Sequence, residues 1–452
     1  MRTKSIDMLS SSLWKSIILY SVPLMFSNVL QVLFNMADVM VVGRFSGPLA
    51  LGSVGSTTMI IQLETGILFG LSTGICAIVA FHTGAKQKDG VEKAIHTSVV
   101  LSVILGVSLL IIGILSARSF LSLLKTKDEL IVEATLYLRI YFLGVPALSL
   151  YNCGNAILTA NGETKRPLLY LLLSGVVNVL LNLLFVIVFK LSVLGVALAS
   201  VISQYLSAFL ILRYLICTDT DYRIVPKLIK YDRILSKEIL RIAIPCACQH
   251  ALFSLSNLFV QASINYFPHY VVEGCAAGGN SDPLVYDMMA AFYTASTGFI
   301  SQNLGGGKID RIKTTYIVTT VYSFILGLIL GGLLVIFRRE FIMLFTSHEE
   351  VIKYGEIRVM IMGASYCISA FMDNATASSR GCGKTIGPTI IIVMGTIVFR
   401  IIWIFTVFRY FHTLESLFLL YVSSWVLTAI CANIYFCYSY KKIKKMHSYK
   451  PA

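Results

Sequence analysis

The sequence is poor in charged residues. Only 13% of its 452 residues are Asp, Glu, Lys or Arg, whereas 56% are apolar, and the mean hydropathy is +0.79. An average soluble domain carries about 25% charged residues. The shortage of charge therefore excludes a water-soluble globule and indicates a polytopic membrane protein.

The sequence also lacks the usual patterns of a metal site or a catalytic centre. Its ten Cys are scattered through apolar stretches without a CxxC pair, which is typical of packing residues and not of disulfides or zinc sites. Cys246 and His250 stand four residues apart, but no third ligand lies nearby in the sequence. The GCGKT segment at 381–385 has Ser378 where a phosphate-binding loop needs its first glycine. We expect neither an enzyme nor an enzymatic cofactor.

Long apolar stretches, in contrast, are abundant. A helix needs about 20 apolar residues to cross a bilayer. The sequence offers about twelve such stretches, near 13–40, 49–82, 94–117, 131–157, 168–189, 192–217, 239–266, 284–303, 314–337, 352–378, 386–408 and 413–440. They predict an all-α polytopic fold with about twelve transmembrane helices.

The net charge of +14 is unevenly distributed over the predicted loops. If the N-terminus is cytoplasmic and the sides alternate, 25 of the 37 Lys and Arg lie on the cytoplasmic side, nine lie opposite, and three lie within spans. This bias is the positive-inside pattern with both termini in the cytoplasm. It argues against a nucleic-acid-binding protein, whose charge would gather on one face of a soluble domain.

The two halves of the chain repeat. At an offset of 222, Pro23 falls on Pro245 and Asn35 falls on Asn257, and at 221 the segment GETKRP at 162–167 falls on GKTIGP at 383–388. We predict two pseudo-symmetric six-helix bundles around a central cleft, formed by residues 1–217 and 239–452 and joined by a polar cytoplasmic linker at 218–238. Such a plan suits alternating access. A duplicated channel remains an alternative.

Asp38 is the acid that stands out within the predicted spans. An ionisable side chain in a membrane helix costs about 2.5 to 3.5 kcal/mol on insertion scales and usually faces a protein interior or a watery cavity. The repeat offset places Val260 at the matching position of the second half. The acid therefore has no counterpart, and the charge chemistry is weighted toward the first half.

Several segments resemble those of a known family. They are FNMADVMVVGRFSG (34–47), ILTANGETKRP (157–167), SGVVNVLLNLLF (174–185), LGVALASVISQ (194–204), FISQNLGGGKIDR (299–311) and SRGCGKTIGP (379–388). In this order they resemble the multidrug and toxic compound extrusion (MATE) family, in particular bacterial members of a Clostridia-like type. The resemblance implies twelve helices in two lobes and export of organic, often cationic compounds in exchange for Na+ or H+.

The resemblance also implies a cation site in the first lobe. Asp38 matches the acid on the first helix, Asn178 matches an Asn on the fifth, and Ser200 matches a hydroxyl on the sixth. Asn182 stands where relatives carry an Asp, which removes one negative charge from the site. Thr159 is a second departure, since an Arg often precedes the GETKRP loop.

The residues themselves support such a site. Asn178 and Asn182 are four apart, so that their amides share one helix face. With Asp38 and Ser200 they offer four oxygen-bearing side chains, the donors that a hard cation prefers, and Asp38 with Asn178 are the expected Na+ ligands. A proton is the alternative, because burial disfavours the charged form of a lone carboxylate. Equally, the Asn side chains could only link helices by hydrogen bonds.

Other polar residues are candidates for the substrate cleft. Glu64 could serve as a counter-charge for a cationic substrate, or it could be solvated at a helix end. Asp373 is the clearest acid of the second half, with pairing to Arg380 or Arg358 as the structural alternative. The remaining candidates flank the predicted eighth span or form the repeat pair of the first and seventh spans: Asp282, Asp287, Asn35 and Asn257.

Together these features predict a secondary active exporter of small organic compounds in the bacterial cell membrane, working as a monomer in the lipid bilayer without nucleic acid. Na+ or H+ would be the coupling ion. The nearest alternative is a lipid-linked saccharide flippase of the same superfold. Such a flippase would line its cleft with several cations to hold a pyrophosphate, whereas only Arg139, Arg358 and Arg400 lie within spans here.

Overall fold

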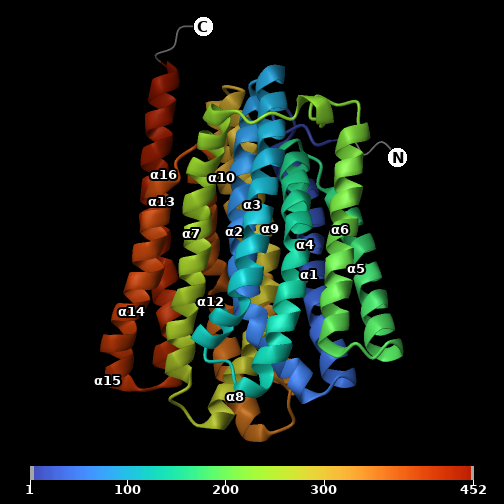
Figure 1. Cartoon of the computed structure of the whole chain (residues 1–452). Helices are drawn as coiled ribbons and strands as arrows, with labels where there is room; N and C mark the ends of the chain where they lie inside the picture. Colours follow the sequence, from blue (N-terminus) through green and yellow to red (C-terminus); the bar gives the residue numbers. More distant parts are fainter. Residues whose placement is uncertain (1–4, 449–452) are drawn as a thin grey trace. The chain divides into compact units, whose positions relative to one another are not determined.

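The computed structural model describes residues 5–448, and this part of the chain folds into helices joined by short turns (Figure 1). In the first half the helices are α1 (Leu13–Phe45), α2 (Pro48–Gly84), α3 (Lys88–Leu123), α4 (Asp128–Ala160), α5 (Lys165–Leu183), the π-helical segment η1 (Leu184–Val188), α6 (Ser192–Cys217) and the 3₁₀ turn η2 (Pro226–Leu228). The predicted all-α fold is confirmed.

The second half continues in the same manner. Its helices are α7 (Arg233–Ile264), α8 (His269–Gly279), α9 (Ser281–Gly305), α10 (Ile309–Ile336), α11 (Arg338–Met343), α12 (Glu349–Gly381), α13 (Ile386–Ile392), η3 (Val393–Val398), α14 (Phe399–Trp403), η4 (Ile404–Phe408), α15 (Arg409–Phe411) and α16 (Leu414–Ser448). The elements from α13 to α15 follow one another directly and form a single long helical segment in which the π-helical pieces alternate with α-helix.

Ten of the described helices are long and apolar enough to cross a membrane. Their outer faces carry large apolar side chains such as Leu115, which is 76% exposed and would be costly to leave in water. The predicted spans at 284–303 and 352–378 fall within α9 and α12, which are long helices but less apolar. The membrane character that the sequence predicts is therefore confirmed.

Sequence breaks explain where the helices end. Between α1 and α2, Gly47 adopts a φ of 88°, which a residue with a side chain rarely adopts. Pro48 follows at the first position of α2, where its missing N–H costs nothing and its fixed φ suits the helix. These two residues end α1 soon after Asp38 and so fix the position of the acid near the end of its helix.

The helices form two compact units. Unit 1 is formed by Phe26–Ala247, and unit 2 is formed by Asp7–Met25 together with the chain from Cys248 onward. The boundary falls inside α1 and inside α7, two residues after Pro23 and two residues after Pro245. Each of these helices thus supplies its first part to one unit and its second part to the other.

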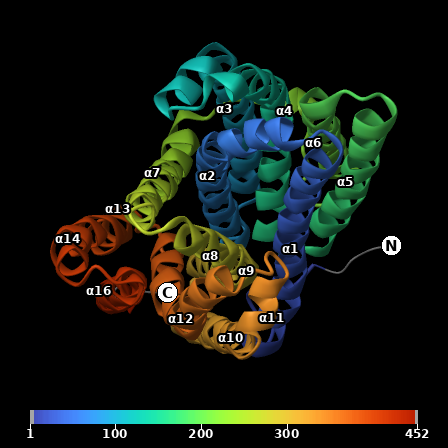
Figure 2. The same ribbon diagram turned by 90° about the horizontal axis from the view of Figure 1, so that it is seen from below.

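Glycine permits close helix packing inside unit 1. A Cβ atom on Gly70 would lie 2.8 Å from the backbone oxygen of Ala243, and one on Gly74 would lie 2.6 Å from that of Ile239. The backbones of α2 and the first part of α7 therefore touch at these positions (Figure 2). Small residues four apart are typical of membrane helix interfaces.

Carboxylates cap the chain where it enters α1 and α7. Asp232 accepts hydrogen bonds from the N–H groups of Ile234 and Leu235 at 2.8 and 3.0 Å, and so satisfies two free donors at the start of α7. Asp7 does the same for the turn before α1, and its hydrogen bonds with Ser10 lower the pKa of this carboxyl group below its ordinary value.

Candidate functional site

Three helices of unit 1 bring polar side chains to Asp38. The Asn182 side chain on α5 donates its Nδ2 hydrogen to Asp38 Oδ1 at 2.5 Å, and the Ser200 hydroxyl on α6 donates to Asp38 Oδ2 at 3.3 Å. Asp38 itself lies in the last third of α1. The structure therefore places three of the four predicted coupling residues in direct contact, although they are 144 and 162 residues apart in the chain.

Asn178 completes this cluster. It lies one turn before Asn182 on the same face of α5, and its Oδ1 accepts a hydrogen bond from Asn182 Nδ2 at 3.3 Å. Both amides are buried, with exposed fractions of 5% for Asn178 and 0% for Asn182. The second oxygen, Asn182 Oδ1, is buried and has no hydrogen-bond partner among the described residues. An unpaired buried oxygen is costly, and it provides a donor that an incoming cation could use.

Packing between α1 and α5 holds the cluster in place. A Cβ atom on Gly175 would lie 1.8 Å from the ring of Phe34, so that only glycine leaves room for this ring against α5. Phe34 precedes Asp38 by four residues and therefore shares its helix face. The aromatic contact sets the distance between the acid and the two amides.

The surroundings of the cluster are apolar. Val41 and Val42 on α1, Tyr137 on α4 and Val196 with Ala197 on α6 belong to one buried core cluster. Within residues 5–448, no group of three or more His, Cys, Asp and Glu side chains could hold a metal ion. Asp38 is thus a single negative charge among neutral oxygens, an arrangement that suits one monovalent cation or one proton.

Glu64 is a second acid inside unit 1. It lies on α2 with only 3% of its surface exposed, and its Oε1 atom has no hydrogen-bond partner among the described residues. Thr65 Oγ1 lies 3.5 Å from Oε2, and Tyr141 on α4 lies within electrostatic range of both Glu64 and Asp38. The alternative of a solvated helix end does not apply, because the side chain is buried in the structure.

In unit 2, Asp282 forms an ion pair. Its Oδ2 atom lies 2.7 Å from Nη2 of Arg358, while Oδ1 accepts a hydrogen bond from Tyr366. Arg358 also donates to the backbone oxygen of Cys275 at 2.7 Å and lies over the ring of Phe418. These contacts join α8, α9, α12 and α16. Asp282 is therefore part of a helix-joining ion pair, and Arg358 is engaged there and not with Asp373.

Asp373 and Asp287 lie close to Tyr286. Asp373 on α12 is within hydrogen-bonding reach of Tyr286 on α9 and within electrostatic range of Arg380. Asp287 directly follows Tyr286 and is half-buried. Arg380 in turn donates a hydrogen bond to Gln249 on α7. Asp373 therefore takes part in a polar contact between α9 and α12 that is separate from the Asp282 pair.

The repeat pair of asparagines differs between the units. Asn35 is exposed on α1, one turn before Asp38. Asn257 on α7 accepts hydrogen bonds from Arg400 Nη1 at 3.2 Å and from Tyr421 at 3.4 Å. Sequence reasoning counted Arg400 only as a cation within a span and gave it no role. The repeat could have indicated a role for Arg400, because the offset of 222 that pairs Asn35 with Asn257 also pairs the predicted site residue Asn178 with Arg400.

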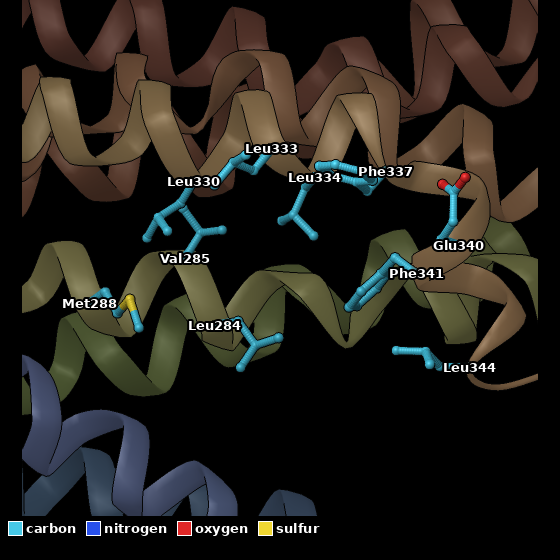
Figure 3. Close-up of a pocket in the computed structure, with 10 residues that line it drawn as sticks. All are labelled: Leu284, Val285, Met288, Leu330, Leu333, Leu334, Phe337, Glu340, Phe341 and Leu344. Atoms are coloured by element: carbon cyan, nitrogen blue, oxygen red, sulfur yellow. The ribbon is translucent and has the colours of Figure 1, made fainter.

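Unit 2 also contains an apolar pocket of about 540 Å³ between α9, α10 and α11 (Figure 3). Apart from Glu340 its walls are aliphatic or aromatic, and none of the predicted site residues lines it. The lining residues are Leu284, Val285, Met288, Leu330, Leu333, Leu334, Phe337, Glu340, Phe341 and Leu344. Its composition suits hydrocarbon and not an ion.

A bundle of membrane-spanning helices with polar residues gathered inside each unit is typical of a membrane transporter. A profile of the protein family described as MatE matches residues 23–184 and 245–406. The chain belongs to this family, the multidrug and toxic compound extrusion (MATE) transporters. The two matched ranges are offset by 222 residues at both ends, which confirms the duplication predicted from the sequence.

Individual relatives agree with this assignment. The chain is 29% identical over 390 residues to the probable multidrug resistance protein YoeA of Bacillus subtilis, covering 84% of both chains. It is 25% identical to the probable multidrug resistance protein NorM of Thermotoga maritima, covering 88% of this chain and 86% of that one. A solved structure of a multidrug resistance MATE family transporter in an outward-facing conformation superposes with a TM-score of 0.92 at 23% identity, covering 98% of this chain and all of the other. The last comparison supports the fold.

Proposed function

We propose that this protein is a secondary active exporter of organic compounds in the bacterial cell membrane, and that binding of Na+ or H+ at Asp38 drives it. The observation that carries the proposal is the convergence of Asp38, Asn182 and Ser200 from three helices of unit 1. The names of the relatives as multidrug resistance proteins support the same kind of cargo.

The donor set fits a small monovalent cation. Asp38 supplies the charge, while Asn178, Asn182 and Ser200 supply neutral oxygens, including the unpaired Asn182 Oδ1 atom. Na+ would use these oxygens directly, whereas a proton would need only one carboxylate oxygen and a hydrogen-bond acceptor. A single charge suits either ion, because nothing else in the described cluster has to be neutralised.

Coupling needs no covalent step. An ion that binds Asp38 more tightly in one state of the transporter than in another shifts the balance between these states by the difference in binding free energy. In our proposal residues 1–217 and 239–452 act as two lobes, and the occupied cation site favours the state that releases cargo outside. A thousandfold difference in ion affinity would supply about 4 kcal/mol of such bias.

The buried Glu64 and the half-buried Asp373 and Asp287 outside the cation site suit organic cations. We assign Glu64 in unit 1 and Asp373 with Asp287 in unit 2 as counter-charges for cargo, and Asn35 as a neutral contact. Glu64 has an oxygen without a partner, and such an oxygen would gain a strong charge-assisted hydrogen bond from a protonated amine. Asp282 is excluded from this group, because Arg358 already neutralises it.

The experiment that tests the proposal is efflux of a fluorescent organic cation from proteoliposomes under an imposed Na+ gradient and, separately, an imposed pH gradient. Wild-type protein is compared with Asp38→Asn and with the control Asp219→Asn, which removes an equal charge from an exposed loop residue. We expect one gradient to drive efflux, Asp38→Asn to abolish it and Asp219→Asn to leave it unchanged.

Two results would overturn the proposal. Efflux that is independent of both gradients would show that neither Na+ nor H+ drives transport. Gradient-driven efflux in Asp38→Asn at the wild-type rate would show that Asp38 is not needed for coupling. Movement of cargo without a gradient would instead favour a flippase.

A further inference from the structure

Arg400 is the largest fully buried side chain described in the structure, with 0% of its surface exposed. It lies on α14, in the middle of the segment Ile386–Phe411, which is long and apolar enough to span the membrane. A guanidinium group keeps its charge in proteins under all ordinary conditions. A full positive charge is therefore buried inside unit 2.

No carboxylate pairs with this charge among the described residues. Arg400 Nη1 donates to Asn257 Oδ1 at 3.2 Å, and Nε donates to the Ser424 hydroxyl at 3.4 Å. The rings of Tyr421 and Phe253 lie 4.3 and 5.0 Å from the guanidinium carbon. All of these partners are neutral.

One edge of the guanidinium group has no acceptor. Nη2 of Arg400 is buried and has no hydrogen-bond partner within residues 5–448. A buried charge that lacks both a counter-charge and part of its hydrogen bonds is strongly unfavourable, even with two aromatic faces beside it. This arrangement is stable only if something else compensates it.

A partly buried arginine of the same unit, Arg358, has a counter-charge. Arg358 has Asp282 at 2.7 Å and the backbone oxygen of Cys275 at the same distance. Arg358 therefore has a counter-charge, although its Nε atom is also without a hydrogen-bond partner among the described residues, whereas the printed partners of Arg400 are all neutral. The difference indicates that the missing partner of Arg400 is not part of the described chain.

We propose that Arg400 anchors a binding site for an oxyanion, a carboxylate or a phosphate group, within unit 2. Nη2 and Nη1 present the two parallel donors with which arginine binds such groups. Asn257, the neutral acceptor that Nη1 now uses, is an exposed residue, so that an arriving anion can replace its amide oxygen from the surface of the unit. This inference rests on the proposed function, because the oxyanion would belong to the cargo.

The backbone around Arg400 supports a site that can rearrange. The five-residue helix α14 lies between two π-helical segments, η3 and η4. Such segments are rare and are frequently found at functional sites, because their wider turns loosen the regular backbone ladder. Helices bend most readily at such turns, so that the segment around Arg400 can change its shape there.

The substrate class follows from this site. Cargo with an acidic group would place its carboxylate or phosphate at Arg400, and zwitterionic cargo would add an amine for one of the buried acids. Purely cationic compounds would gain nothing from Arg400. The protein should therefore prefer a compound with a free acid over its neutral ester.

The test measures binding to the purified full chain in detergent by fluorescence anisotropy. The probes are a rhodamine that carries a free benzoate and its methyl ester, which differ only in the acidic group. We expect the free acid to bind roughly tenfold more tightly, in line with a charge-assisted hydrogen bond. Arg400→Gln should abolish this preference, whereas Arg139→Gln, which removes an exposed arginine of unit 1, should retain it.

A second measurement uses wild-type protein alone, so that a poorly folded variant does not decide the question. Inorganic phosphate and the anionic lipid phosphatidylglycerol are each added in titration while the Tm is followed. A rise in Tm with phosphate would indicate a soluble oxyanion, and a rise with the lipid alone would indicate a headgroup, since any ligand that binds only the folded state raises the Tm.

Equal binding of acid and ester by wild-type protein, together with no rise in Tm, would overturn the proposal. So would an acid preference that Arg400→Gln retains. These outcomes are distinct from a failure of the exporter proposal, because binding is measured without any gradient. A retained acid preference in a protein that shows no gradient-driven efflux would leave the oxyanion site standing and reject only the coupling.

Discussion

The polar sites of the two units carry opposite charges at corresponding places. In unit 1 the acid Asp38 on α1 faces neutral amides on α5 and a hydroxyl on α6. In unit 2 the base Arg400 on α14 faces the amide of Asn257 on α7 and the hydroxyl of Ser424 on α16. The repeat offset pairs Asn178 with Arg400 and Asp38 with Val260. The corresponding helices of the two halves therefore contact each other at both sites, whereas the charge of the site is negative in unit 1 and positive in unit 2.

The two units therefore suit different ligands. A lone carboxylate surrounded by oxygens attracts a small cation or a proton, whereas a lone guanidinium surrounded by aromatic rings attracts a flat anionic group. The helix packing next to both sites is similar, because each site has a glycine at a close helix contact. Gly175 precedes Asn178 and lies against Phe34, and Gly395 precedes Arg400 and lies against Thr428. We therefore expect the chemistry of each site to be changed by substitutions that leave the packing intact.

The largest effect should come from the arginine that already has a partner. Arg358→Met leaves the carboxylate of Asp282 with Tyr366 but without its counter-charge, which should cost about 3 kcal/mol of stability. Thermal unfolding of the purified protein measures this loss as a fall in Tm. Arg339→Met is the control, because its ion pair with Glu349 is exposed and should contribute nothing measurable.

A similar loss in both variants would mean that burial of Arg358 is not what matters. The Tm of Arg400→Met provides a second comparison with Arg358→Met. Arg400→Met removes a charge without a counter-charge and should leave the Tm unchanged or higher. A large fall for Arg400→Met would show that its neutral partners already compensate the charge.

The next effect concerns the packing that positions Asp38. Gly175→Val would drive a side chain into the ring of Phe34, which lies 1.8 Å from the place of the first added carbon. Overpacking of this kind costs about 2 kcal/mol, and it should also displace Asp38 from Asn182. Tm and gradient-driven efflux are both expected to fall.

Gly55→Val provides the matched control on α2, because nothing lies within 4 Å of a Cβ atom at that position. Should the two valine variants behave alike, the close contact between α1 and α5 would not be what holds the acid in place.

The third prediction adds the acid that the family resemblance leads us to expect at position 182. Asn182→Asp adds a second carboxylate 2.5 Å from the present position of Asp38 Oδ1. The added attraction for a cation exceeds the repulsion only when a cation is present, so that Na+ affinity should rise roughly tenfold. Isothermal titration calorimetry of Na+ measures the change.

The direction of the change in Na+ affinity also distinguishes Na+ from H+ as the coupling ion. Tighter Na+ binding by Asn182→Asp, with retained efflux, would support a Na+ site at this cluster. No heat from Na+ in either protein would point to the proton.

The smallest effect should come from the hydroxyl of Ser200. Ser200→Ala removes one hydrogen bond to Asp38, which is 3.3 Å long and hence weak. A loss of about 0.5 to 1 kcal/mol, or two- to fivefold in ion affinity, is expected. Ser203→Ala is the control, because that hydroxyl donates to the backbone of Ser200 and not to the acid. Identical ion affinities in wild type and Ser200→Ala would exclude the hydroxyl from the site.

Much of the fold follows from the sequence. Runs of about 20 apolar residues predict the spans, and the interval 192–217 coincides with α6 at both ends, because charged or turn-forming residues flank it. The four residues predicted to form the coupling site also lie together, since the spacing of Asn178 and Asn182 fixes one helix face; their coupling role stays a prediction.

The charge partners could not be predicted in the same way. The pairing of Arg358 with Asp282 joins residues 76 apart, and it depends on how α8, α9 and α12 pack. The isolation of Arg400 is a property of its surroundings, for which a sequence pattern gives no direct measure. Glu64 is similar, because its burial results from the helices packed around α2 and not from its own neighbours in the chain.

The positions of the π-helical segments can be compared between the two halves of the chain. η1 ends the fifth span of the first half at Leu184–Val188, and η4 lies 220 residues further on at Ile404–Phe408. Two copies of so rare a backbone form at matching places are most simply inherited from one ancestral half. η3 differs, because the matching residues near 172–177 form regular α-helix in α5. Among the described residues this π-helical segment therefore belongs to the second half alone, on the same helical segment as Arg400.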